Sequence, residues 1–181
     1  GLHNIRNATG ALGAVVALGG DLDRAVEALG EFRGVGRRFD RLGEAGGVAI
    51  VDDYAHHPSE LVATLAAARQ AYPGRRLVAV FQPHLYSRTQ QHGAAMGLAL
   101  AAADVVVVTE VYAAREQPIN GVTSELISQG VPGVQQYNGD IADLAGALRP
   151  TLKSGDVCLF MGAGNIDDAA QTLLAQLQGE K

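Results

Sequence analysis

Several residue types are scarce in this sequence of 181 residues, and each scarcity excludes a class of protein. The single cysteine, Cys158, cannot form a disulfide within the chain, which excludes a disulfide scaffold and favours a cytoplasmic location. Gly, Asp or Arg interrupts every apolar run well before the roughly 18 residues that a transmembrane helix needs. No basic segment followed by an apolar one opens the chain. We therefore expect neither a membrane span nor a signal peptide.

Lysine is nearly absent, because twelve of the fourteen basic residues are arginines. A phosphate-binding loop of the form G-x-x-x-x-G-K-[ST] needs a lysine between a glycine and a serine or threonine. Lys153 precedes Ser154, but Leu152 stands where the glycine should be, and Glu180 stands in that place before Lys181. This loop is therefore missing from the sequence.

The composition otherwise describes a globular chain. Hydrophobic residues make up 48% of it, and a chain of this length buries about 70% of its unfolded surface. The formal net charge is -5, which argues against nucleic acid as a partner, since the protein would bind phosphates against its own field.

Charge and glycine content divide the sequence near residue 46. Residues 1–46 hold six basic and six acidic residues, so the rest of the chain carries the whole net charge. Two short helices are expected at residues 4–18 and 21–32, with Asp21 as the N-cap of the second. Residues 43–47 are interpreted as a turn or linker. We accordingly expect one domain portion at 1–46 and a second domain at 47–181.

From residue 47 onward, short apolar runs alternate with helical segments. Wholly apolar strands separated by helices are typical of a parallel sheet covered on both faces. The fold class is therefore α/β, with a doubly wound, mostly parallel, Rossmann-like sheet preceded by a short helical segment. The expected strands are 48–51, 77–81, 105–108, 134–137 and 157–161, and the expected helices are 59–71, 87–103, 123–129, 141–148 and 166–177.

Polar residues follow the ends of these strands, where ligands bind in such sheets. Asp53 is placed to accept hydrogen bonds from ribose hydroxyls, and Arg88 to grip a carboxylate with two parallel hydrogen bonds. His56, His84 and Asp53 also allow a second hypothesis, a metal-dependent hydrolase. A third is a non-catalytic nucleotide-binding module. The pair Gly162 and Gly164 indicates close backbone packing, because the third glycine of a dinucleotide fingerprint is missing.

Two further clusters have an ordinary interpretation as surface residues. His3, Asn4 and Asn7 gather at the start of the first helix, where an asparagine amide can either read adenine or simply face solvent. Arg37 and Arg38, just before the linker, are interpreted first as a basic pair on the surface.

Four strings give a more specific indication. In order and spacing they resemble the Mur ligases, over essentially the whole chain, and the last two are most similar to the members that join L-alanine to UDP-N-acetylmuramate. The strings are residues 1–8 (GLHNIRNA), 36–39 (GRRF), 52–58 (DDYAHHP) and 81–89 (FQPHLYSRT). A peptidoglycan-recycling ligase that attaches a ready-made peptide shares the third string and is the alternative within the family.

The resemblance implies the end of a central ATPase domain followed by the C-terminal Rossmann-like domain. It implies that ATP phosphorylates the muramoyl carboxylate and that the amine of L-alanine then attacks the acyl phosphate. ATP and magnesium would serve the complete enzyme, with neither bound by this portion alone. No catalytic residue and no metal ligand is expected here, and many relatives carry arginine in place of Leu85.

The same resemblance assigns binding residues. The implied ATP-binding residues are His3, Asn4 and Asn7 toward adenine, with Arg38 and Asp53 toward the ribose and phosphates. The implied residues on the L-alanine side are Tyr54, His56, His84 and Arg88.

Overall fold

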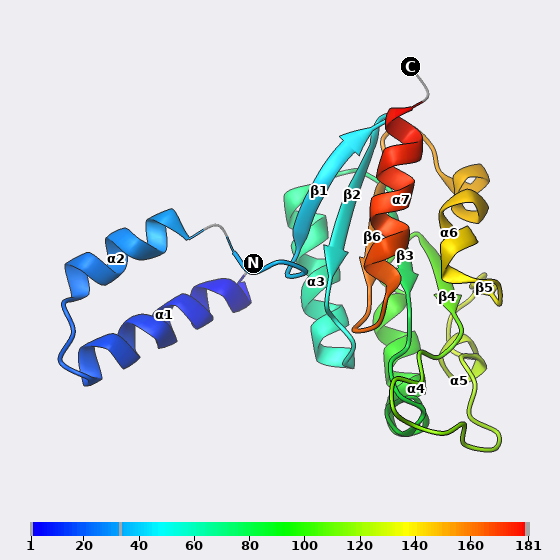
Figure 1. Cartoon of the computed structure of the whole chain (residues 1–181), viewed down its shortest axis with the longest axis horizontal. Coiled ribbons are helices and arrows are strands. Elements are labelled where there is room, and N and C mark those ends of the chain that lie inside the picture. Colours follow the sequence, from blue (N-terminus) through cyan, green and yellow to red (C-terminus); the bar gives the residue numbers. More distant parts are fainter. Residues whose placement is uncertain (1, 33, 180–181) are drawn as a thin grey trace. The chain divides into compact units, whose positions relative to one another are not determined.

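The computed structural model describes residues 2–32 and 34–179. For Leu2 and His3 it describes the backbone alone. The chain divides into two compact units, and the division falls between Val35 and Gly36. The first unit contains α1 (Leu2–Ala17) and α2 (Leu22–Glu31), as expected (Figure 1). Asp21 caps α2, because its side chain accepts a hydrogen bond of 3.1 Å from the backbone N–H of Arg24.

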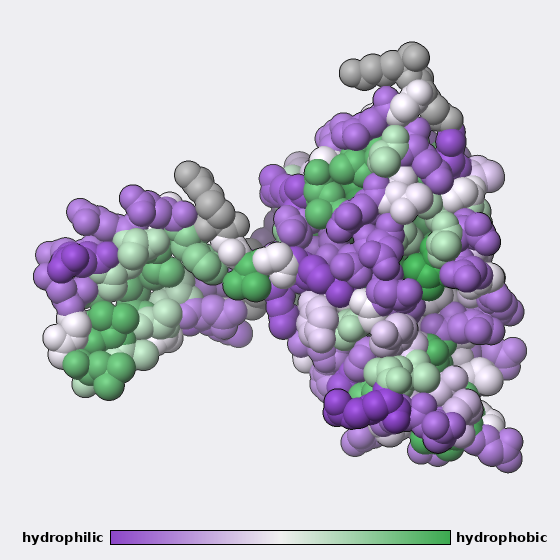
Figure 2. Space-filling model, in the orientation of Figure 1, coloured by the Kyte–Doolittle hydropathy of each residue, from purple (hydrophilic) through white to green (hydrophobic). Residues whose placement is uncertain are grey.

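The helices of the first unit bury little apolar surface. No residue of α2 is buried, and large apolar side chains of both helices are exposed, which Figure 2 shows as green areas on this unit. The exposed side chains include Ile5, Val16, Leu22 and Val26. Two helices of this length therefore do not make a closed core by themselves.

The second unit is built on a six-stranded sheet with the order β1-β2-β6-β3-β4-β5. All neighbouring strands run parallel except β1 and β2. This confirms the predicted doubly wound, mostly parallel sheet. The strands are β1 (Asp40–Ala45), β2 (Val48–Asp53), β3 (Leu77–Phe81), β4 (Val105–Thr109), β5 (Gln135–Tyr137) and β6 (Val157–Met161).

Helices cover both faces of the sheet (Figure 1). Alternate strand residues point to opposite faces, so Val51 and Leu159 pack on one side and Ile50 and Phe160 on the other. The first face is covered by α3 (Pro58–Ala71), α4 (Tyr86–Leu100) and α5 (Glu125–Ser128), and the second by α6 (Ile141–Leu148) and α7 (Ile166–Gln178). A short 3-10 turn, Arg149–Thr151, follows α6.

The interpretation of residues 43–47 as a linker was wrong in part. β1 extends to Ala45 and pairs antiparallel with β2, and only Gly46 and Gly47 form the turn between the two strands. Both glycines have positive φ, 57° and 76°, which glycine adopts without strain. β1 thus belongs to the second unit, and the units meet earlier in the chain than residue 46.

No helix in the described part of the chain is both long and apolar enough to cross a bilayer.

Candidate functional site

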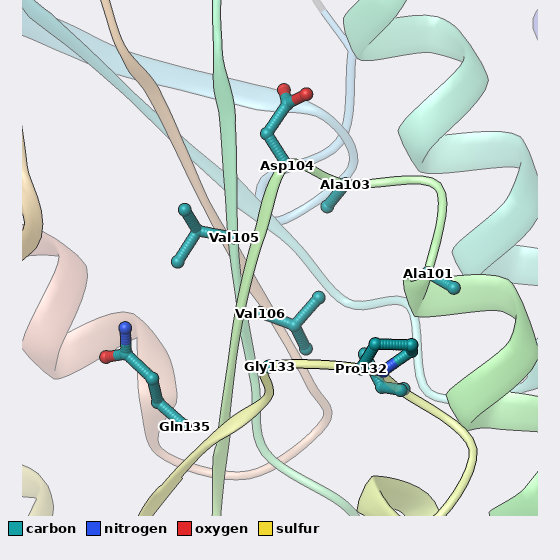
Figure 3. Close-up of a pocket in the computed structure, with 9 residues that line it drawn as sticks. Ala101, Ala103, Asp104, Val105, Val106, Pro132, Gly133 and Gln135 are labelled. Atoms are coloured by element: carbon teal, nitrogen blue, oxygen red, sulfur yellow. The ribbon is translucent and has the colours of Figure 1, made fainter.

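Two cavities lie at opposite ends of the parallel strands. One, of about 290 Å³, is lined by Asp104, Val105 and Gln135 at the amino ends of β4 and β5 (Figure 3). The other, of about 720 Å³, is lined by Tyr86, Glu110 and neighbouring residues beyond the carboxyl ends of those strands. Only the second cavity shares an edge of the sheet with the polar residues that the sequence singles out.

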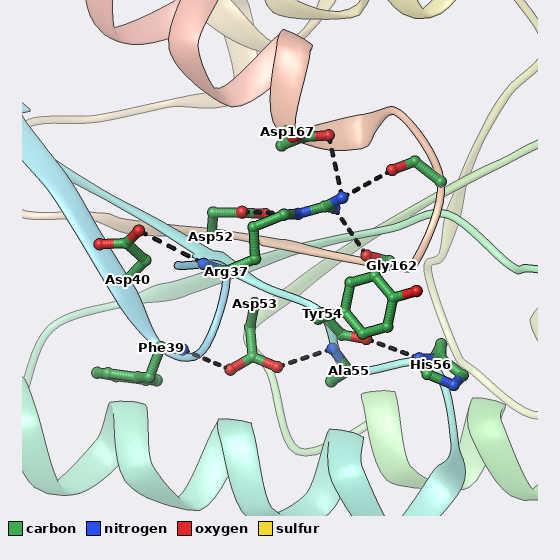
Figure 4. Close-up of polar contacts among 11 residues, drawn as sticks. Arg37, Phe39, Asp40, Asp52, Asp53, Tyr54, Ala55, His56, Gly162 and Asp167 are labelled. Carbon is green, nitrogen blue, oxygen red and sulfur yellow. Dashed lines mark hydrogen bonds and ion pairs between the residues drawn. The ribbon is translucent and has the colours of Figure 1, made fainter. Parts of the chain in front are cut away.

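Asp53 ends β2 and organises the chain around it (Figure 4). The residue is 7% exposed. One carboxylate oxygen accepts the N–H of Ala55 at 2.8 Å, and the other accepts the N–H of Phe39 at 2.7 Å. Each oxygen keeps a lone pair, so the carboxylate is held rigidly and can still accept a further hydrogen bond.

Arg37 occupies the same edge, and its interpretation as a surface residue was wrong. Its Nε donates to Asp52 at 3.0 Å, and its two Nη atoms donate to the carbonyls of Gly162 and Gly164, each at 2.9 Å (Figure 4). Asp167 lies 3.3 Å from Nη1. The guanidinium therefore joins the ends of β2 and β6 to the start of α7.

Asp52 is the buried partner in this network. It is 2% exposed, and its Oδ1 has no hydrogen-bond partner among the described residues. Burial raises the pKa of Asp52 to about 6, although the Arg37 guanidinium opposes the shift. A carboxyl whose pKa is raised on folding stabilises the fold when protonated and loses that contribution as pH rises through its folded pKa.

Replacing Asp52→Asn should make this loss visible. From about pH 3.5 to about pH 7.5, the unfolding free energy of the wild type minus that of the variant should fall by about 2–3 kcal/mol, most of it between pH 4 and 6. Urea unfolding at each pH measures it. Asp168→Asn, at an exposed position, is the control for exchanging a carboxylate for an amide. A difference that increases with pH would contradict the raised pKa.

The four residues predicted for the amino-acid side come together. The rings of Tyr54 and His56 meet edge to face with centroids 5.2 Å apart, and the His56 and His84 centroids are 6.1 Å apart. Arg88 completes the group, because its Nη1 lies 3.2 Å from Nδ1 of His84. These residues, which follow β2 and β3, form one cluster that we call the strand-end cluster.

His84 holds Arg88 in a defined orientation. Burial, assisted by the Arg88 cation, lowers the pKa of His84, so the imidazole is neutral at neutral pH and its Nδ1 accepts from Arg88. Nη1 also donates to the His84 carbonyl at 3.3 Å. Within the described part of the chain, Nε and Nη2 of Arg88 make no hydrogen bond. This edge of the guanidinium has the geometry that binds a carboxylate through two hydrogen bonds.

The glycines after β6 allow the close packing expected of them. A Cβ atom on Gly162 would lie 2.8 Å from the carbonyl oxygen of Gln82, and one on Gly164 would lie 2.7 Å from Cγ of Tyr112. The Tyr112 ring in turn stacks on His84 with centroids 5.7 Å apart. Side chains at these two positions would push the β6 end away from the strand-end cluster.

The predicted ATP-binding residues are divided between the two units. Asn4 and Asn7 are exposed on α1, and the side chain of His3 lies outside the described residues. Arg38 is exposed in the second unit, and its guanidinium carbon lies 5.3 Å from the centre of the Tyr54 ring. The structure thus brings Arg38, Asp53 and the strand-end cluster to one edge of the sheet.

Comparison with known proteins assigns the chain to a family. The family model described as "Mur ligase, glutamate ligase domain" matches residues 37–164. The chain belongs to the Mur ligases. The second unit begins at Gly36, and the family match begins one residue later, at Arg37.

Curated relatives of this Mur ligase chain include two UDP-N-acetylmuramate–L-alanine ligases. That of Salinibacter ruber is 44% identical over 184 residues, which cover 99% of this chain and 39% of the relative. That of a Mycobacterium species is 48% identical over 186 residues, covering 98% of this chain and 37% of the relative. The chain thus spans well under half the length of these relatives.

Solved structures of Mur ligases have the same fold. The UDP-N-acetylmuramate-alanine ligase of Thermotoga maritima matches all of this chain and 39% of its own, with 31% identity and a TM-score of 0.80. The murein peptide ligase of Psychrobacter arcticus matches 98% of this chain and 37% of its own, with 27% identity and a TM-score of 0.74.

The hypothesis of a metal-dependent hydrolase finds no support in this Mur ligase chain. Among residues 2–32 and 34–179, no three His, Cys, Asp or Glu side chains are grouped so that they could hold a metal ion. His57 turns away from His56, contacting Ser59 through Nδ1 at 3.0 Å and the ring of His92 at 4.8 Å.

Proposed function

We propose that this chain is the C-terminal portion of an ATP-dependent ligase that joins L-alanine to UDP-N-acetylmuramate in peptidoglycan synthesis. The observation that carries the proposal is the Nε and Nη2 edge of Arg88, which makes no hydrogen bond within the described part of the chain while His84, just after β3, holds Nη1. An amino-acid carboxylate is a planar anion that matches this edge. Identities of 44% and 48% to ligases that carry this name support the same substrate.

In this proposal, Arg88 binds the carboxylate of L-alanine, and Tyr54 and His56 line the site beside it. ATP phosphorylates the muramoyl carboxylate, and the amine of the bound L-alanine attacks the acyl carbon. A C–N bond forms, the bond from that carbon to the phosphate oxygen breaks, and phosphate leaves. Binding the carboxylate fixes the direction of the amine, which lowers the entropic cost of the attack.

We propose further that α1 and α2 belong to a central ATP-binding domain and that the sheet is the C-terminal ligase domain. Asn4 and Asn7 would contact adenine from the first unit, and Arg38 and Asp53 the ribose and phosphates from the second. The described residues offer no cluster for a magnesium ion. In this proposal the protein ligands of the magnesium ion lie in other segments of the complete enzyme.

A murein peptide ligase is the second candidate. It is supported by a structure of the same fold at 27% identity, which is lower than the 44% and 48% found with the L-alanine ligases. We therefore favour the single amino acid as the nucleophile.

The isolated chain should fold in its second unit but should not turn over. Its sequence has no G-x-x-x-x-G-K-[ST] loop, so in this proposal the main cradle for the ATP phosphates comes from other segments of the complete enzyme. A coupled assay of phosphate release with ATP, UDP-N-acetylmuramate and L-alanine should give the rate of the protein-free control. Sustained release by this chain would contradict the assignment of catalysis to other segments.

A further inference from the structure

The side chain of Arg37 bridges the carboxyl ends of the paired strands β2 and β6, through Asp52 and the carbonyl of Gly162 (Figure 4). It is 25% exposed, and its three nitrogens all donate to acceptors within the second unit. The backbone of Arg37 has φ 59°, a left-handed conformation that is uncommon for a residue with a side chain. The structure therefore holds this arginine in an unfavourable conformation that lets it reach those acceptors.

Arg37 also holds Tyr54 directly. The carbonyl of Arg37 accepts the N–H of Tyr54 at 2.7 Å, and the guanidinium carbon lies 5.3 Å from the centre of the tyrosine ring. The carbonyl of Tyr54 lies 2.7 Å from Nδ1 of His56. A continuous series of contacts thus runs from Arg37 through Tyr54, His56 and His84 to Arg88.

We propose that Arg37 is a positioning residue for the amino-acid site: it locks the ends of β2 and β6 together and thereby fixes Tyr54 and His56 beside Arg88. The inference rests on the proposed function, since it assigns the strand-end cluster to the amino acid. Arg37 itself faces Asp52 and the carbonyls of Gly162 and Gly164, so it acts through other residues.

Only arginine suits this place. The acceptors of Arg37 are distributed around one planar guanidinium, with Asp52 at Nε, Gly162 at Nη2 and Gly164 at Nη1. A lysine would supply the charge from a single ammonium and could not donate from three separate nitrogens. Arg37→Lys should therefore resemble Arg37→Ala rather than the wild type.

The kinetic test uses the complete ligase with Arg37→Ala and Arg37→Lys. The KM for L-alanine should rise about tenfold in both, because small displacements of positioning groups weaken binding by such factors. The KM for UDP-N-acetylmuramate should stay unchanged. Arg41→Ala is the matched control, because the exposed Arg41 likewise lies 5.3 Å from the centre of a tyrosine ring, that of Tyr72. The Arg41→Ala variant should leave the KM for L-alanine and the KM for UDP-N-acetylmuramate unchanged.

A merely structural role predicts a different pattern. Loss of folded enzyme would lower kcat and leave both KM values as they are, and that result would overturn the inference. If Arg37→Ala does not fold, the double variant Arg37→Ala with Asp52→Asn removes the buried carboxylate together with its partner, and it should show the same rise in the KM for L-alanine.

NMR of the 181-residue chain separates this inference from the proposed function. Without any substrate, Arg37→Ala should shift the ring signals of His56 and His84, whereas Arg41→Ala should not. Unmoved histidine signals would overturn the positioning role whatever the substrate is. If these signals shift but the complete enzyme does not use L-alanine, the proposed function fails while the structural coupling stands.

Discussion

Replacing Arg88→Ala should raise the KM for L-alanine of the complete ligase by about 100-fold, the cost of losing a bidentate, charge-assisted grip on a carboxylate. The KM for UDP-N-acetylmuramate should change little. Arg88→Lys should recover only part of the loss, because an ammonium cannot reproduce the Nε and Nη2 edge. Steady-state phosphate release at varied L-alanine measures both effects.

Arg115→Ala is the control for this prediction. Arg115 is exposed, and its charge is close enough to lower the pKa of His84 slightly, behind the larger effects of burial, Arg88 and His56. Removing it tests whether any nearby cation serves the site. Equal increases in KM for Arg88→Ala and Arg115→Ala would show that general charge, rather than the geometry of Arg88, attracts the amino acid.

Replacing Arg76→Ala should cost about 3–5 kcal/mol of unfolding free energy, because it leaves a buried carboxylate without its partner. Arg76 donates to the two oxygens of Asp156 at 2.9 and 2.7 Å and to the carbonyl of Thr151 at 2.7 Å. Burial alone would raise the pKa of Asp156, but hydrogen bonds from Arg76 and from the Lys153 amide hold it below its usual value. Asp156 is therefore ionised at neutral pH and depends on Arg76.

The matched control is an exposed ion pair of the same composition. Arg69 lies 2.9 Å from Asp104, and both side chains are 42% exposed. Arg69→Ala should cost no more than about 1 kcal/mol, since water solvates the remaining charge. Urea unfolding of both variants gives the comparison, and a similar loss in the two would contradict the role of burial.

The fold could be predicted wherever a strand is wholly apolar. The strands β2, β3 and β6 have a neighbouring strand on each side and are buried, and each contains an apolar run that the sequence shows: residues 48–51, 77–81 and 157–161. β1 carries no such signal, because the edge strand Asp40–Ala45 pairs on one side only and is mostly half-exposed. Its charged residues and Gly43 suggested a linker instead.

The strand-end cluster could be predicted because polar residues directly follow buried strands. The network around Arg37 could not, since its acceptors at Gly162 and Gly164 lie far along the chain. The adjacent pair Asp52 and Asp53 was the one sequence feature that could have indicated this network. Adjacent strand residues point to opposite faces, so two carboxylates at the end of a buried strand need separate partners. Asp53 accepts hydrogen bonds from two backbone amides, and Asp52 accepts one from Arg37.

The most direct test of the proposed function is phosphate release by the complete ligase with ATP and UDP-N-acetylmuramate, offered either L-alanine or the ready-made tripeptide. Our account predicts phosphate release that depends on L-alanine and is not supported by the tripeptide, with equal amounts of phosphate and amide product. Turnover with the tripeptide but not with L-alanine would contradict it.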